Sequence, residues 1–415
     1  MKTAEIITIG TEIVLGQIAN TNSQYIAKVL TERGIQALFQ TSIADDKESL
    51  KSILKIANDR ANLIITTGGL GPTANDITRE TVSEFFGVPL VIDKESYARS
   101  QNRLAGKHEN MLDEYRKQAL IPEGAFVISN DNGTANGFAL RHGEVEIVCL
   151  PGVPREMQFM LNKYLEIYAL KGKREEGCKL IRNLHTFGIS ERAVEDAFKD
   201  CSVAEGQIKT ITLVHDGIVT INMLVTAIER ESAVEILNRA ERDMRKKFGR
   251  AVFGVDDMGL EDAVAMLLKG HNKTIAVAES CTGGLVSDKL TNIPGISEFF
   301  LEGIVAYSNK AKIDILGVPE DLILKYGAVS PQVARAMADG VKKKSSANIG
   351  IGITGIAGPT GATKEKPVGL VYVAVVVDDS AEVKEYRFRG SRIDIKKFSA
   401  NTALNMVRLK LMDNC

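Results

Sequence analysis

The sequence has no tryptophan, few cysteines and almost no net charge, and no apolar run approaches the ~20 residues of a membrane-spanning helix. The five cysteines are widely scattered, which argues against a disulfide framework or a zinc site and favours reduced thiols in the cytoplasm. The five histidines show no paired spacing, so a bound metal is expected to be a hard cation held by carboxylates. No secretory signal pattern precedes the first predicted strand.

Charges of opposite sign are balanced, with 52 lysines and arginines against 53 aspartates and glutamates. Basic runs such as Lys342–Lys344 are short and typical of solvated helix faces. We therefore expect neither nucleic acid nor membrane among the partners. A hydrophobic content of 44% is typical of a soluble globular protein, and a length of 415 residues predicts two or three domains.

Residues 1–170 alternate apolar strands with amphipathic helices, which is typical of a mainly parallel sheet covered by helices on both faces. Ligands bind such domains beyond the carboxyl ends of the strands. The predicted strands are 4–9, 37–43, 63–67 and 145–150, and the predicted helices include 22–32 and 48–58.

A charged, glycine-broken segment at 170–177 resembles a linker and leads into a small α+β module, and we place the linker and module together at 171–254. The module lacks the glycine-bearing loop of nucleic-acid-binding KH domains, so we interpret it as a spacer or dimerisation element. Its predicted elements are strands at 184–188, 208–214 and 219–225, and helices at 191–199 and 232–248.

Residues 255–415 return to the α/β pattern, and Ser330 followed by Pro331 predicts the start of a helix that runs to Val341. The predicted fold class is therefore α/β, with two three-layer α/β domains of mainly parallel sheets joined by the small α+β module. The predicted strands of the last domain are 274–278, 303–307, 348–354, 369–377 and 383–388.

The most informative motif, Ala278-Glu-Ser-Cys-Thr-Gly-Gly284, joins a predicted buried strand to a predicted helix. Ser280 stands at this turn, where the free backbone N–H groups near Thr282, Gly283 and Gly284 can stabilise an anion. A hydroxyl needs a base to become a nucleophile, and a desolvated lysine can serve. Lys312 is the candidate base, and Tyr307 is a candidate proton relay or oxyanion donor. The pattern indicates an amide-hydrolysing site.

Other interpretations of this motif remain open. Ser280 can simply cap the following helix, as serines in that position commonly do. Cys281 is a rival nucleophile, because a helix N-terminus lowers the pKa of a thiol. Lys310 and Lys312 can both be ordinary surface charges.

A second loop of the last domain, at 354–361, follows a predicted strand and is rich in glycine. Its backbone donors suit a nucleotide phosphate, and the guanidinium of Arg392 is a candidate partner for the same phosphate. A surface hairpin is the alternative. The predicted binding residues of this loop are Gly355, Ala357, Gly358 and Gly361.

Two further glycine loops follow strands of the first domain. A phosphate can approach the backbone of one loop, which also opens a helix. Asp45 and Asp76 could together hold a Mg²⁺-like ion and bridge it to a diphosphate, although Asp45 and Asp46 can instead cap the next helix. The predicted binding residues are Gly68, Gly69, Gly71 and Thr73 in the first loop, and Asn132, Gly133 and Thr134 in the second.

The combination of motifs resembles the competence/damage-inducible protein CinA family in its long bacterial form, over essentially the whole chain. The motifs are spread over the first and last domains, so the resemblance does not depend on one loop. They are Gly10-Thr-Glu-Ile with Gly16, Asn20-Thr-Asn22, Thr67-Gly-Gly-Leu-Gly-Pro-Thr73, Leu150-Pro-Gly-Val-Pro154, Ala278–Gly284 and Gly355-Ile-Ala-Gly-Pro359.

The resemblance implies two activities that recycle broken-down NAD. It implies a molybdopterin-binding-like first domain that acts as a metal-dependent ADP-ribose pyrophosphatase, with Asp45 and Asp76 on the metal, giving AMP and ribose 5-phosphate. It implies a last domain that converts nicotinamide mononucleotide to nicotinate mononucleotide and ammonia without a cofactor, with Ser280, Tyr307 and Lys312 implicated in catalysis. The resemblance also implies that the protein forms a homodimer.

The sequence departs from the family pattern at two positions of the first domain. Asn75 replaces an aspartate next to Asp76, and Asn136 replaces a proline, which we expect to loosen the loop at 130–137. An alternative function for this domain is therefore binding of a pterin or nucleotide without turnover. Because every amidohydrolase motif is intact, we rank that activity first.

Overall fold

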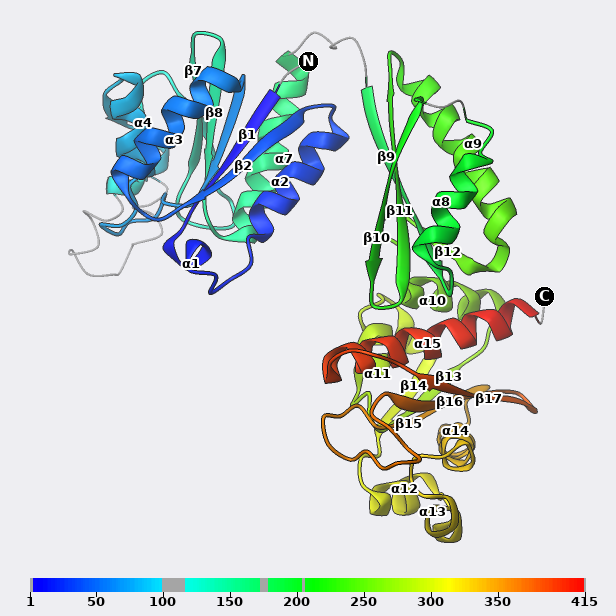
Figure 1. The fold of residues 1–415 in the computed structure, drawn as a ribbon. Coiled ribbons are helices and arrows are strands. Elements are labelled where there is room, and N and C mark those ends of the chain that lie inside the picture. The colour runs from blue at the N-terminus through cyan, green and yellow to red at the C-terminus, as the bar shows by residue number, and fades with distance from the viewer. Residues whose placement is uncertain (1–2, 99–115, 172–177, 204–205, 414–415) are drawn as a thin grey trace. The chain divides into compact units, whose positions relative to one another are not determined.

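A computed structural model of the chain describes residues 3–98, 116–171, 178–203 and 206–413. The chain divides into two compact units, one formed by residues 1–181 with 225–235 and the other by residues 182–224 with 236–415. Each unit contains an α/β domain of the predicted class (Figure 1).

The N-terminal domain is built on a six-stranded sheet in the order β2-β1-β3-β8-β7-β6. The first four strands in this order are parallel, and β7 and β6 are added antiparallel. The chain runs from β1 outward to β2 and then crosses to β3, so the carboxyl ends of β1 and β3 form the switch point where ligands bind. The strands are β1 (Thr3–Ile9), β2 (Gln36–Ile43), β3 (Leu63–Thr67), β6 (Phe126–Ile128), β7 (Gly137–His142) and β8 (Val145–Leu150), with a separate pair β4 (Leu90–Ile92) and β5 (Leu120–Pro122).

Helices cover both faces of this sheet, as the alternating pattern predicts (Figure 1). Apolar side chains of α2 and α7 pack with one face of the sheet, and those of α3 and α4 pack with the other. The domain therefore has three layers and two buried cores. The helices are α1 (Thr11–Val14), α2 (Thr21–Glu32), α3 (Lys47–Arg60), α4 (Thr78–Phe86) and α7 (Pro154–Lys171).

The middle module is an antiparallel sheet in the order β10-β11-β9-β12 with two helices. The sequence analysis did not predict its last strand, β12 (Val252–Val255), which pairs antiparallel with β9. Ser190 caps α8 by accepting a hydrogen bond from Ala193 N at 3.2 Å. The other elements are β9 (Cys178–Phe187), α8 (Glu191–Lys199), β10 (Ile208–His215), β11 (Ile218–Ala227) and α9 (Arg230–Phe248).

The C-terminal domain has a five-stranded sheet in the order β14-β13-β15-β16-β17. The first three strands in this order are parallel and the last two antiparallel. The strand after the Ser280 motif, predicted at 303–307, lies at 300–305, because the chain leaves the sheet before Ala306. The strands are β13 (Ile275–Glu279), β14 (Phe300–Val305), β15 (Ile349–Gly355), β16 (Leu370–Val377) and β17 (Ser380–Arg387).

Two helical layers enclose this sheet as well. One core joins the sheet to α10, α11 and α15, and a second core joins it to α12, α13 and α14. The chain again reverses at its first strand, so the carboxyl ends of β13 and β15 form a second switch point. The helices are α10 (Leu260–His271), α11 (Leu285–Thr291), α12 (Asn309–Leu316), α13 (Glu320–Tyr326), α14 (Pro331–Ser345) and α15 (Arg392–Asp413).

Candidate active site

Ser280 is the first residue after β13, at the switch point of the C-terminal sheet. Its backbone N–H donates to Ile353 O at 3.0 Å, which fixes the turn against the neighbouring strand β15. The side chain is largely buried. The strand-to-turn position predicted for this serine is therefore confirmed.

Glu279, the last residue of β13, organises the turn and was missed by the sequence analysis. Its carboxylate is fully buried and accepts hydrogen bonds from the N–H groups of Gly284 at 2.9 Å, Val286 at 3.2 Å and Ser287 at 2.9 Å. The hydroxyl of Ser287 adds a fourth bond at 2.8 Å. The first turn of α11 is thus satisfied by Glu279, so Ser280 is not the cap of this helix.

Lys312 reaches Ser280 from α12. Its Nζ lies 3.1 Å from Ser280 Oγ, 2.9 Å from Ala306 O and 3.1 Å from Tyr307 O. The side chain is 1% exposed, and this burial lowers the pKa of the Lys312 amine. A neutral amine has two N–H groups and one lone pair, which match two carbonyl acceptors and one hydroxyl donor. The surroundings of Lys312 therefore suit a base directed at Ser280.

The neighbouring Lys310 shows what an ordinary lysine in this helix does. It is exposed and pairs with Asp314 at 2.6 Å, and the hydrogen bond that it donates to this carboxylate raises the pKa of Lys310. The two lysines differ because Lys312 points to the sheet and Lys310 to solvent. The surface-charge interpretation is correct for Lys310 and wrong for Lys312.

Cys281, the rival nucleophile, is buried, and this burial raises the pKa of its thiol to about 12. The thiol is thus protonated at neutral pH, and thiolate is the nucleophilic form. The helix N-terminus that was expected to lower the pKa of Cys281 is already occupied by Glu279. The local environment therefore favours Ser280 over Cys281.

Two of the three predicted oxyanion donors are engaged within the protein, which corrects the sequence analysis. Gly283 N donates to Ser280 O at 3.2 Å, and Gly284 N donates to Glu279 at 2.9 Å. Within the described residues, only the N–H of Thr282 remains from the predicted set. The hydroxyl of Thr282 is also buried and has no partner among the described residues.

A cavity of about 180 Å³ opens beside Ser280 and Lys312. Tyr307 is 61% exposed, and its hydroxyl accepts a hydrogen bond from Arg392 at 2.9 Å. Arg392 also donates to Gly358 O at 2.6 Å, so it connects two loops around the cavity. The lining residues are Ser280, Cys281, Tyr307, Asn309, Lys312, Ala328, Val329, Thr354, Gly355, Ala357 and Arg392.

The predicted phosphate loop of this domain contributes Gly355 and Ala357 to the cavity lining, whereas Gly358 and Gly361 are not among the lining residues. Gly358 and Gly361 have φ angles of 75° and 88°, which glycine adopts without strain. Lys366 donates to Tyr326 O and Val329 O at 2.7 Å each, so its charge fastens the connection between α13 and α14. Arg392 is thus the predicted cation that reaches this cavity.

The predicted metal ligands of the N-terminal domain lie in two different loops. Asp45 accepts hydrogen bonds from the N–H and hydroxyl of Thr11, both at 2.9 Å. Asp46, and not Asp45, caps α3 by accepting from Ser49 N at 2.7 Å. The capping alternative is therefore confirmed for Asp46 alone.

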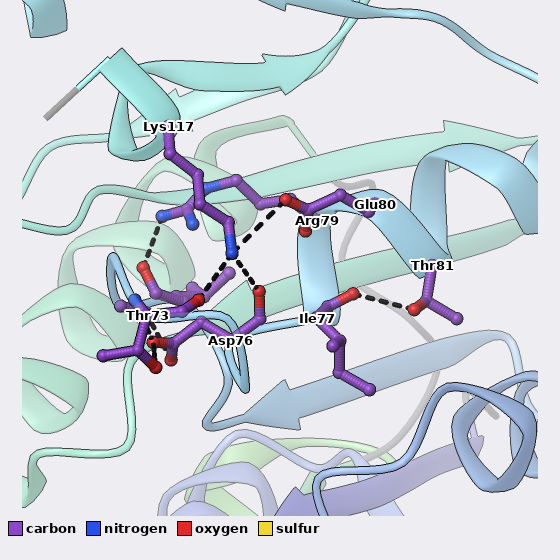
Figure 2. A network of polar contacts seen from close by, with 9 residues as sticks. Thr73, Asp76, Ile77, Arg79, Glu80, Thr81 and Lys117 are labelled. Atoms are coloured by element: carbon purple, nitrogen blue, oxygen red, sulfur yellow. Dashed lines mark hydrogen bonds and ion pairs between the residues drawn. The ribbon is translucent and has the colours of Figure 1, made fainter. Parts of the chain in front are cut away.

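Asp76 is held within the glycine loop (Figure 2). Its carboxylate accepts from Gly71 N at 2.7 Å, from Thr73 N at 2.8 Å and from the Thr73 hydroxyl at 2.6 Å. Gly71 and Thr73 were predicted to bind phosphate, but these donors already bind the carboxylate of Asp76. This result corrects the predicted use of both residues.

Two cations donate hydrogen bonds to carbonyl groups of the same loop (Figure 2). Lys117 donates to Thr73 O at 2.6 Å and to Asp76 O at 2.8 Å. Arg79 is fully buried and donates to Leu70 O at 2.6 Å, and burial lowers its pKa to about 10. These contacts hold the carbonyls of Leu70, Thr73 and Asp76 and so fix the conformation of the loop.

Gly68 and Gly69 are required by close packing at the switch point. A Cβ atom on Gly68 would lie 2.0 Å from Ile9 O, and one on Gly69 would lie 2.3 Å from the hydroxyl oxygen of Thr78. Gly68 N donates to Leu150 O at 3.0 Å. Gly68 therefore joins the ends of three neighbouring strands.

A metal in this domain would depend on the carboxylates of Asp45 and Asp76. Asp45 accepts hydrogen bonds from Thr11 in the loop after β1, and Asp76 accepts them from its own loop. No group of three or more His, Cys, Asp or Glu side chains in the described part of the chain is placed to hold a metal ion. Mg²⁺ is usually bound by one or two carboxylates together with substrate phosphates and waters. The described residues therefore provide no complete protein cage for a metal, and a metal at Asp45 and Asp76 would need oxygens from a bound phosphate.

The loop at 130–137, which contains Asn132, Gly133 and Thr134, is closed by asparagines. Asn136 accepts from Asn130 N at 2.9 Å and donates to the Ser96 hydroxyl at 2.6 Å. Asn130 donates in turn to Glu156 at 2.6 Å. The expectation that Asn136 loosens this loop is wrong, because both the oxygen and the nitrogen of its side-chain amide form hydrogen bonds.

Comparison with family profiles places the chain in a class of three-part α/β proteins. The profile described as "Probable molybdopterin binding domain" matches residues 5–171, "Damage-inducible protein CinA KH domain" matches residues 181–254, and "CinA C-terminal domain" matches residues 257–411. No helix among the described residues is long and apolar enough to cross a membrane.

The chain belongs to the CinA family. It is 42% identical over 410 residues to a "Putative competence-damage inducible protein" of Caldicellulosiruptor bescii, covering 99% of both chains. It is 40% identical over 409 residues to a "CinA-like protein" of Dictyoglomus thermophilum, again covering 99% of both. A solved competence/damage inducible protein from Agrobacterium tumefaciens is 39% identical, with a TM-score of 0.36, and the match covers 37% of this chain and 93% of that one.

Proposed function

We propose that the C-terminal domain hydrolyses nicotinamide mononucleotide to nicotinate mononucleotide and ammonia. The observation that supports this proposal most strongly is the buried Lys312 Nζ at 3.1 Å from Ser280 Oγ. This pair provides a nucleophile and its base, and the resemblance to nicotinamide-nucleotide amidohydrolases supplies the substrate. The activity of the N-terminal domain is proposed separately below.

The reaction begins when neutral Lys312 takes the proton of the Ser280 hydroxyl while Ser280 Oγ attacks the carboxamide carbon. The C–N bond then breaks, Lys312 returns the proton to the leaving nitrogen, and ammonia departs. The nicotinoyl group is left as an ester on Ser280. Lys312 next takes a proton from water, which hydrolyses the ester and restores the serine.

The developing oxyanion needs donors that are not already used. The N–H of Thr282 is one candidate, and the Tyr307 hydroxyl, which accepts its hydrogen bond from Arg392 at 2.9 Å, is the other. Because Tyr307 accepts from a cation, its own proton remains free to point into the cavity. This arrangement suits Tyr307 as an oxyanion donor better than as a base.

The test is ammonia release from nicotinamide mononucleotide, with the nucleotide product separated chromatographically. Ser280→Ala should lower kcat by more than about a thousandfold, since it removes the attacking atom. Cys281→Ala is the matched control and should keep activity. Substantial turnover by Ser280→Ala, or loss only in Cys281→Ala, would assign the reaction to another nucleophile.

For the N-terminal domain we propose binding of a phosphorylated pterin or nucleotide at the switch point between β1 and β3. The specific observation that favours binding over metal-dependent cleavage is that both aspartates already accept backbone hydrogen bonds, Asp45 from Thr11 and Asp76 from its own glycine loop. Hydrolysis of ADP-ribose to AMP and ribose 5-phosphate is the competing function. Tight nucleotide binding in calorimetry without AMP formation in the presence of Mg²⁺ supports our proposal, whereas AMP formation that Asp76→Asn abolishes contradicts it.

A further inference from the structure

The first turns of α15 place two cations beside the candidate active site. Arg392 lines the cavity and contacts Tyr307 and Gly358. Lys396 follows four residues later, so both side chains lie on the same side of the helix. A Cβ atom added to Gly283 would lie 3.6 Å from Lys396 Nζ, which places this amine against the Ser280 loop.

These two cations lack a neutralising carboxylate in the described residues. The two bonds of Arg392 go to a carbonyl and a phenol, both of them neutral. Lys396 has no ion pair or hydrogen bond within the described part of the chain. The nearby carboxylates are engaged, Glu279 by the first turn of α11 and Asp394 by Ser391 N at 2.8 Å. Arg392 in the cavity lining and Lys396 against the Ser280 loop therefore form a pair of cations without a carboxylate partner among the described residues.

We propose that Lys396, together with Arg392, binds the phosphate of the substrate and so selects a mononucleotide over the nucleoside. The inference rests on the proposed amide hydrolysis, because it assumes that the carboxamide lies at Ser280. The phosphate is at the opposite end of a nicotinamide mononucleotide, so it lies away from Ser280, on the side where Arg392 and α15 border the cavity. An ammonium and a guanidinium together match a phosphate dianion in charge and in hydrogen-bond donors.

The neighbouring residue Lys397 provides a matched control. It pairs with Asp216 at 3.3 Å and thus already has a counter-ion. Lys396 and Lys397 are equal in size and charge and are adjacent in the same helix, but α15 presents them in different directions. If the loss of one positive charge from α15 were enough to weaken substrate binding, substitution of either lysine by glutamine would have the same effect.

The experiment compares ammonia release from nicotinamide mononucleotide and from nicotinamide riboside, which lacks the phosphate. Lys396→Gln should raise KM for the mononucleotide about tenfold or more, since it removes a charge-assisted hydrogen bond, and should leave the riboside reaction unchanged. Lys396→Arg should restore most of the affinity. Lys397→Gln should change neither substrate.

An equal effect of Lys396→Gln on both substrates, or no effect on either, overturns the phosphate site while leaving the hydrolysis intact. If the wild-type protein releases no ammonia from either compound, the proposed function fails. Calorimetry with the mononucleotide then decides about the site. If the mononucleotide binds Lys396→Gln more weakly than wild type, the phosphate site is supported. If it binds both proteins equally, or does not bind wild type, the phosphate site is overturned.

Discussion

At the scale of single residues, burial decides which groups can react. Lys312 and Lys310 differ by two positions in one helix, yet burial lowers the pKa of Lys312 while a carboxylate raises that of Lys310. Cys281 and Ser280 are neighbours, but desolvation keeps the thiol protonated. A side chain type alone therefore does not identify the base or the nucleophile at this site.

The lowered pKa of Lys312 predicts the pH dependence of catalysis. The neutral amine is the active form, so kcat/KM should rise with pH and level off below the ordinary lysine value of 10.5. Lys310→Met should leave this profile unchanged, because Lys310 is exposed and lies outside the cavity. A rate that falls with increasing pH over the same range would require a protonated lysine and would contradict the assignment of Lys312 as base.

The sequence was sufficient to predict Ser280 and Lys312, because both belong to motifs that follow strands. It was insufficient for Glu279 and Lys396. A carboxylate at a strand end usually faces solvent, and the burial of Glu279 depends on how the next turn folds back. The signal that identifies it is an acidic residue shortly before a helix whose first turn lacks a capping side chain. The position of Lys396 next to the Ser280 loop could not be predicted, because it depends on the packing of α15 against Gly283.

At the scale of elements, glycines set how closely helix α14 approaches β15. A Cβ atom on Gly352 would lie 2.1 Å from Ala334 O and 2.6 Å from Ala338 N. The strand periodicity predicts β15 itself, but not this contact, because the sequence does not show which helix covers the strand. The antiparallel pair β6 and β7 was missed for a different reason. β6 has only three residues, which is too short to show a strand periodicity.

We expect Gly352→Ala to destabilise the protein by about 1–3 kcal/mol, because the added methyl group overlaps the backbone of α14. Gly270→Ala is the control. Gly270 lies in α10 with nothing within 4 Å of an added Cβ, so the substitution should be neutral or stabilise the helix by up to about 1 kcal/mol. Denaturant unfolding measures both. Equal stability of the two variants would show that the helix moves away from the strand without cost.

At the scale of the whole molecule, the two α/β domains lie in separate compact units with separate cores. The alternation of strands and helices was enough to predict two three-layer domains and a small module between them. It did not predict that β12 extends the sheet of the middle module to Val255, because four residues carry too little periodicity. Each candidate site is built from residues of its own domain.

Because the sites belong to separate units, a change in one should not alter the chemistry of the other. Asp76→Asn removes the charge that the glycine loop binds in the N-terminal domain. We expect it to change nucleotide binding there and to leave kcat and KM for ammonia release within about twofold of wild type. A large loss of ammonia release in a folded Asp76→Asn protein would show that the two units are coupled.

The central claim, that Lys312 activates Ser280, is tested most directly by a double-mutant cycle on kcat for ammonia release. Lys312→Met and Ser280→Ala should each lower kcat by at least about a hundredfold. The double variant should be no slower than the slower single variant, because a nucleophile and its base act as one unit. Near-normal kcat in Lys312→Met, or losses that multiply in the double variant, would contradict the account.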